Sequence, residues 1–189
     1  TEFDPAGAFR DYAEAAKSGH LAARHMEATC VLNGMGTARN RPLGASMLQE
    51  LAGSGYAPAA ISLGRCYEYG YGVERDRSKA FTIYRELTDA GNKAGMYNLG
   101  RCYMDGIGVE KDGYYAYSLY CAAAGRGSIH GIYGLARCHI GAVGTEKNRD
   151  LGLKLLESCV SYGLTDAMVM LGQLNARGKQ IKKNTQASA

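Results

Sequence analysis

The sequence predicts an all-α protein built as a solenoid of antiparallel helix pairs. Glycines, cysteines and helix-capping residues each recur every 36 residues, without slippage. A fixed period of this length is typical of repeat proteins in which each unit packs on its neighbours. The glycines lie at 19, 55, 91, 127 and 163, the cysteines at 30, 66, 102 and 138, and the Asp or Asn caps at 4, 40, 76, 112 and 148.

The unit at 56–91 shows the predicted helix pair most clearly. Its first helix, which we call the A helix, carries an apolar stripe at every fourth residue. Gly70 and Gly72 end this helix, because glycine readily adopts a left-handed backbone. Asp76 then caps the second, or B, helix, which presents Ala80 and Tyr84 on one face. The stripe of the A helix consists of Ala59, Leu63 and Tyr67.

The same spacing places the other units. The chain opens on a B helix at about 5–18, with Asp4 as cap and Pro5 in the first turn. Full repeats follow at about 20–55, 56–91, 92–127 and 128–163, and a last A helix at about 165–177 brings the expected number of helices to ten. The solenoid therefore spans 1–178, with half repeats at 1–19 and 164–178. Residues 179–189 are expected to form a polar, basic and disordered tail.

Composition and charge exclude several classes of protein. The net charge is +4, but four basic residues near the C-terminus supply that amount, so the remaining chain is nearly neutral. It lacks the basic stripe of a nucleic-acid binder. No run approaches 18 apolar residues, so no membrane span is expected, and residues 1–5 do not resemble a secretion signal.

Residues 59–84 follow the pattern A-x-x-x-L-G-x-x-Y-x-x-G-x-G-V-x-x-D-x-x-K-A-x-x-x-Y. Residues 95–120 repeat it with Gly95 and Tyr115 as exceptions, and it fades over 131–156, where Ala142 and Leu156 depart from it. The pattern resembles Sel1-like repeats, which are akin to tetratricopeptide arrays, over nearly all of residues 4–178. The resemblance implies a right-handed α/α superhelix with A helices on its concave side. It also implies a non-enzymatic scaffold or adaptor for protein complexes, without a shared catalytic residue set.

Arginine repeats at a position that the fold does not require. Each repeated arginine lies about 200° around the A helix from the core leucine, so stacked units would align these side chains. Tyr and Arg are enriched at binding hot spots, and we expect a concave groove that binds an extended peptide or a partner helix. The alternative is that the arginines cover the core edge or pair with Glu68 and its neighbours. The residues of this predicted surface, the A-helix face, are Ile61, Arg65, Tyr97, Asn98, Arg101, Tyr133 and Arg137.

The cysteines and histidines do not form a recognisable metal or redox motif. No C-x-x-C occurs, and A-helix axes about 8–10 Å apart exceed the roughly 7 Å reach of a disulfide. The four repeating cysteines are therefore expected to be small buried hydrophobes, which favours a reducing compartment. A bridge involving Cys121 or Cys159 stays open. His139 is expected to be packed and hydrogen-bonded, and the alternative is a metal site formed by His130 and His139. No cofactor or metal is predicted.

Two other functions compete with peptide binding. Cysteine-rich relatives of the family suggest a hydrolase or small-ligand-binding protein. The chain has neither S-x-x-K nor G-x-S-x-G nor H-E-x-x-H, and its G-x-G loops lack the third glycine of a nucleotide fingerprint. No catalytic residue is therefore predicted. The third hypothesis is a segment of a longer scaffold, or a chain that joins a second copy end to end. Its basis is the uncovered last helix, with Met168, Met170, Leu171 and Leu174.

Overall fold

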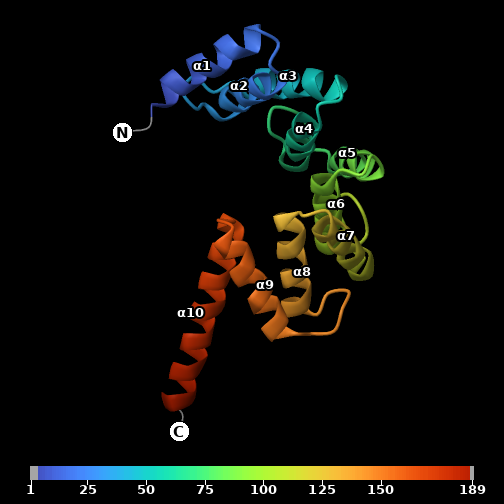
Figure 1. Cartoon of the computed structure of the whole chain (residues 1–189), viewed down its shortest axis with the longest axis vertical. Helices are drawn as coiled ribbons and strands as arrows, with labels where there is room; N and C mark the ends of the chain where they lie inside the picture. The colour runs from blue at the N-terminus through green and yellow to red at the C-terminus, as the bar shows by residue number, and fades with distance from the viewer. Residues whose placement is uncertain (1–3, 188–189) are drawn as a thin grey trace. The chain divides into compact units, whose positions relative to one another are not determined.

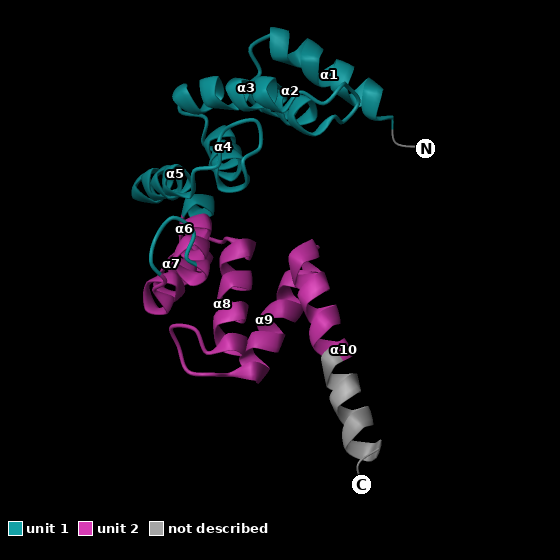
Figure 2. Ribbon diagram, turned by 180° about the vertical axis from the view of Figure 1, so that it is seen from behind, with its two compact units in different colours: residues 1–95, 106–110 teal, residues 96–105, 111–189 magenta. Residues whose placement is uncertain are grey.

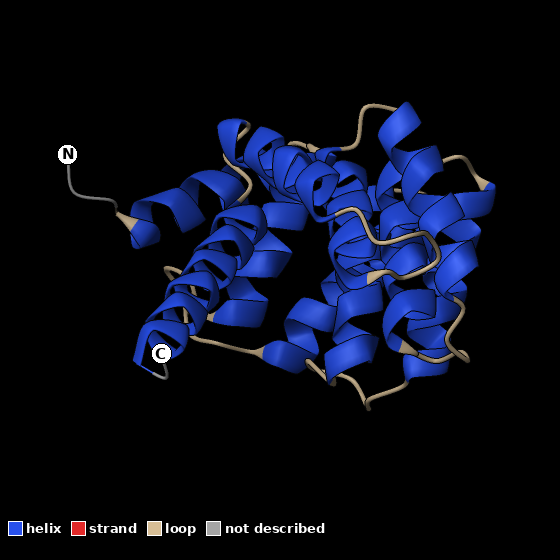
Figure 3. Cartoon of the chain, turned by 90° about the horizontal axis from the view of Figure 1, so that it is seen from below, coloured by secondary structure: helices blue, strands red, loops and turns tan. Residues whose placement is uncertain are grey.

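A computed structural model describes the backbone of residues 4–187 and the side chains of residues 4–176. Within this described backbone, ten α-helices follow one another, joined by short loops (Figure 1). The described residues contain no strand (Figure 3). The all-α prediction and the predicted helix pairs are confirmed. The helices are α1 (Pro5–Lys17), α2 (Leu21–Asn33), α3 (Arg41–Gly53), α4 (Ala57–Tyr69), α5 (Arg77–Asp89), α6 (Lys93–Asp105), α7 (Gly113–Gly125), α8 (Ile129–Gly141), α9 (Arg149–Ser161) and α10 (Thr165–Ala187).

The chain divides into two compact units (Figure 2). Unit 1 comprises residues 1–95 and 106–110, and unit 2 comprises residues 96–105 and 111–189. In unit 1, each of the helices α1 to α4 packs on the next helix in sequence. In unit 2, α7 packs on α8, α8 on α9, and α9 on α10. Sequential packing of this kind is what a helical repeat requires.

Capping residues and glycines set the helix boundaries as predicted. Each of the five predicted Asp or Asn caps accepts a backbone N–H from the first turn of the following helix. Asp76, for example, accepts from the Lys79 N–H at 2.9 Å. Gly72 has φ of 75° and lies against the backbone of Arg41, so a side chain would collide there. Ala142 replaces the equivalent of Gly70 and still adopts a left-handed φ of 55°.

Matched side-chain sizes fill the core of each helix pair. Tyr84 on α5 packs against Gly64 on α4, and Tyr120 on α7 packs against Gly100 on α6. Both tyrosine side chains are fully buried. In the first and fourth full repeats a buried leucine replaces the tyrosine, and alanine replaces the glycine. Ala28 shares a core cluster with Leu48, and Ala136 shares one with Leu156.

The last helix differs from the prediction in two respects. It continues beyond residue 177, where the sequence predicted its end, to Ala187. Most of the predicted tail at 179–189 therefore belongs to this helix, because the backbone of residues 179–187 is helical. Residues 188 and 189, and the side chains from residue 177 on, lie outside the described part of the structure. Met170 and Leu174 were expected to be uncovered, but both pack against the core of unit 2. Met168 and Val169 are exposed. Among the described helices, none is both long and apolar enough to cross a membrane.

Candidate functional site

The two units divide the seven residues of the A-helix face between them. Ile61 and Arg65 lie on α4 in unit 1. The other five lie in unit 2, where α6 carries Tyr97, Asn98 and Arg101, and α8 carries Tyr133 and Arg137. Alignment of the three arginines along one groove would extend across both units, so it stays a prediction.

In unit 2, the tyrosine of α6 belongs partly to the core. The ring centroid of Tyr97 lies 5.9 Å from that of Tyr120 and 5.2 Å from that of His130. Burial raises the pKa of Tyr97 to about 12. Asn98 is only 7% exposed, and its Oδ1 accepts a hydrogen bond from Arg101 Nη1 at 3.2 Å. Asn98 therefore orients Arg101 and offers little surface of its own to a partner.

The charge of Arg137 is neutralised within unit 2. Its Nη2 lies 3.2 Å from Oδ1 of Asp105, and the arginine side chain is 27% exposed. This ion pair joins α8 to the C-terminal end of α6. The sequence left open whether the repeated arginines pair with acidic residues of the chain itself. Arg137 does so, and its partner is Asp105.

Arg65 occupies the same repeat position but is exposed and forms no ion pair within the described residues. Asp105 lies 32 residues before Arg137, and the residue 32 before Arg65 is Asn33, a neutral amide. Arg65 and Asn33 line a small cavity of about 130 Å³, with Thr29, Ser62 and Tyr71 among the other lining residues. Among the side chains that the structure describes, no carboxylate pairs with the cation at this position of unit 1.

A second cavity, of about 290 Å³, lies beside the A-helix face of unit 2. Tyr133 of α8 lines it together with Asp166, Val169, Met170 and Gln173 of α10. The sequence did not single out Asp166. Neither the arginine repeat nor the tyrosine repeat extends to the last helix, so no sequence signal marked that carboxylate.

The two histidines of the possible metal site, His130 and His139, pack against tyrosine rings. The described residues hold no group of three His, Cys, Asp or Glu side chains that could bind a metal. His130 packs on Tyr97, and the His139 ring lies 5.7 Å from the ring of Tyr117. The Nδ1 atom of His139 is buried without a hydrogen-bond partner in the described part, although a hydrogen-bonded role was expected.

The six cysteines, all within the described residues, form no disulfide, which answers the question left open for Cys121 and Cys159. Five are buried, and Cys121 is exposed. Burial raises the pKa of the Cys66 and Cys138 thiols to about 11. A thiol with a raised pKa stays protonated near neutral pH and is a poor nucleophile.

One cysteine per chain is expected to react with an aromatic disulfide reagent at pH 8 in the native protein. The reason is that, of the six thiols, only that of Cys121 is exposed to the reagent and to water. All six thiols should react after unfolding in guanidinium. The released thiolate is measured by absorbance. In the control variant Cys121→Ser, the fast native phase should disappear. A native protein that releases several equivalents at once would contradict the burial described for the other thiols.

Comparison with known proteins identifies the repeats. The sequence model of the family described as Sel1 repeat matches residues 57–92, 93–128, 129–158 and 165–189. No curated protein sequence matched the chain.

Solved structures share the fold. A Sel1 repeat protein from Oxalobacter formigenes aligns with 86% of this chain and 65% of its own, with a TM-score of 0.73 and 24% identity. A protective antigen of uropathogenic Escherichia coli strains, which displays an SLR fold, aligns with 90% of this chain and 36% of its own, with a TM-score of 0.68 and 23% identity. Helicobacter pylori cysteine rich protein B aligns with 67% of this chain and 96% of its own, with a TM-score of 0.50 and 23% identity. The chain thus spans just under two thirds of the first structure and about a third of the second.

Proposed function

The chain belongs to the Sel1 repeat family, and from this premise we propose that it is a non-enzymatic scaffold that binds a carboxylate-bearing segment of a partner protein on its A-helix face. Proteins of this family generally mediate interactions between proteins. Residues outside the core would recognise the partner, because side chains at the core positions are already engaged in packing. No side chain has a catalytic role in this function.

The observation that carries the proposal is the uncompensated charge of Arg65. Arg137 has Asp105 as a partner, whereas Arg65 faces Asn33 and remains exposed. An exposed guanidinium without an ion pair can bind a partner carboxylate at little cost in free energy, since no internal ion pair has to break. Arginine binds carboxylates through paired N–H groups, which adds orientation to attraction. Ile61, one turn earlier, supplies an apolar neighbour for the bound segment.

Selection of a displayed random-peptide library on the immobilised protein tests this proposal. We expect the selected peptides to be enriched in Asp and Glu. Arg65→Ala should weaken binding of a selected peptide about 10-fold or more, as loss of a charged hydrogen bond implies. Fluorescence anisotropy with the labelled peptide measures the change.

Arg85→Ala is the matched control, because Arg85 is exposed in the same unit but lies on the B helix α5, over the ring of Phe81. Its affinity for the peptide should stay within about 2-fold of wild type, as expected for a charge outside the interface. Selected peptides without acidic residues, or equal losses in the two variants, would refute the assignment to Arg65.

A further inference from the structure

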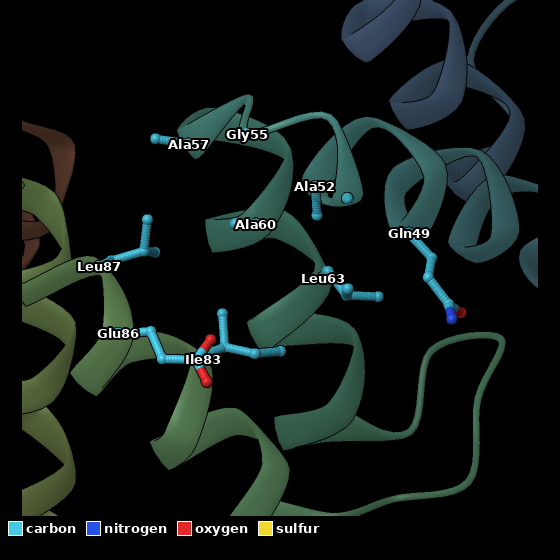
Figure 4. Close-up of a pocket in the computed structure, with 10 residues that line it drawn as sticks. Gln49, Ala52, Gly55, Ala57, Ala60, Leu63, Ile83, Glu86 and Leu87 are labelled. Atoms are coloured by element: carbon cyan, nitrogen blue, oxygen red, sulfur yellow. The ribbon is translucent and has the colours of Figure 1, made fainter. Parts of the chain in front are cut away.

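Unit 1 contains a cavity of about 410 Å³ between α3, α4 and α5 (Figure 4). None of the seven residues of the A-helix face lines it. Its volume lies within the roughly 300–1,000 Å³ that is common for ligand pockets. Two exposed polar side chains, Gln49 and Glu86, contribute to its lining. The apolar side chains around it include Ala52, Ala57, Ala60, Leu63, Ile83 and Leu87.

The cavity exists because two alanines replace longer side chains found at the same positions of the other repeats. The position of Ala57 is occupied by Leu21, Lys93 and Ile129 in the other full repeats. The position of Ala60 is occupied by Arg24, Met96 and Ile132. The opening is thus specific to the repeat at 56–91 and is not a general property of the fold.

Comparison with the other repeats shows that Glu86 lacks the basic partner that its equivalent has. In the preceding repeat the equivalent pair is Arg24 and Glu50, with Arg24 Nη2 3.9 Å from Glu50 Oε2. In the following repeats the glutamate is absent, and apolar Met96 and Ile132 are paired in register with Ala122 and Ser158. The repeat at 56–91 thus has the carboxylate of this pair, in Glu86, but has Ala60 in place of the arginine. Within the described residues, Glu86 forms no ion pair.

We propose that this cavity binds an arginine side chain of a partner polypeptide. The methylene stem would pack against Leu63 and Ile83, and the guanidinium would reach Glu86. The partner would thereby supply the group that Arg24 supplies to Glu50 within the chain. The amide oxygen of Gln49 offers a second acceptor at the same cavity. This site prefers the opposite charge from Arg65 and does not depend on the function proposed above.

Titration with short capped peptides, followed by two-dimensional NMR of the ¹⁵N-labelled protein, tests the proposal. The probe is acetyl-Gly-Arg-Gly-amide, and its neutral isostere carries citrulline in place of arginine. We expect saturable shifts of the amide signals of Ala57, Ala60 and Leu87 with the arginine peptide. The citrulline peptide should bind about 3-fold more weakly, as an exposed ion pair implies.

Two variants separate the charge from the cavity. Glu86→Gln should bind both peptides equally, because the carboxylate that distinguishes them is gone. Ala60→Met should abolish the saturable shifts by filling the cavity with the side chain that the next repeat carries there, while signals outside unit 1 stay in place. Arg65→Ala should leave both titrations unchanged, so the two proposed sites fail independently.

Four results would overturn the proposal. The first is equal affinity of wild type for the arginine and citrulline peptides. The second is a preference for arginine that survives in Glu86→Gln, and the third is binding that survives in Ala60→Met. A lysine peptide that binds as tightly as the arginine peptide would overturn the assignment to a guanidinium.

Discussion

Replacement of Gly100 by leucine is expected to lower the free energy of unfolding by about 3 kcal/mol or more. A Cβ at this position would lie 2.6 Å from Cε1 of Tyr120, well inside van der Waals contact. The tyrosine ring is fully buried, and Gly134 on α8 approaches the same ring, so Tyr120 has little room to move away. Chemical denaturation followed by circular dichroism measures the loss.

Gly172→Leu provides the matched control. Gly172 occupies the same repeat position on α10, and a Cβ added there meets nothing within 4 Å. Its stability should stay equal or rise by up to about 1 kcal/mol, because leucine favours a helix more than glycine does. If Gly100→Leu unfolds at the wild-type denaturant concentration, the close contact between α6 and α7 is wrong.

The fold could be predicted because the signals for helix starts, helix ends and core positions recur with the same 36-residue period. Each repeat brings its own cap, its own helix-ending glycine and its own pair of facing core residues, and these signals agree. The errors occur where the repeat stops. Met170 and Leu174 were judged uncovered because no B helix follows α10, yet packing of α10 on α9 brings both against the core of unit 2.

The candidate site could be predicted only in part, because charge compensation depends on residues of neighbouring helices. The helical wheel assigned one position to Arg65 and Arg137 alike, and it could not show that Asp105 neutralises one while Asn33 leaves the other uncompensated. The cavity beside Ala60 was missed for a related reason. It arises where one repeat departs from the others, whereas a search for periodic residues discards such departures.

Replacement of Tyr120 by alanine is expected to cost about 3–5 kcal/mol of stability, as for other large buried aromatic side chains. The ring packs against Gly100, Gly134 and the ring of Tyr97. Glycine has no side chain that could move into the space, so the cavity would persist. Thermal and chemical denaturation measure the loss. Tyr114→Ala on the same helix is the control, since Tyr114 is 80% exposed and its loss should change stability by no more than about 0.5 kcal/mol.

The side chains paired at these two positions in the other repeats predict which second substitution reduces the loss of stability. Leucine at the Tyr120 position occurs with alanine at the Gly100 position, as in Leu156 with Ala136. Tyr120→Leu and Gly100→Ala should each destabilise the protein, one by leaving space and the other by collision. Together they should cost less than the sum of the two, with a coupling of about 0.5–3 kcal/mol, because the added methyl group occupies part of the vacated space. Additive losses would show that the pairing of glycine with tyrosine is not a packing requirement.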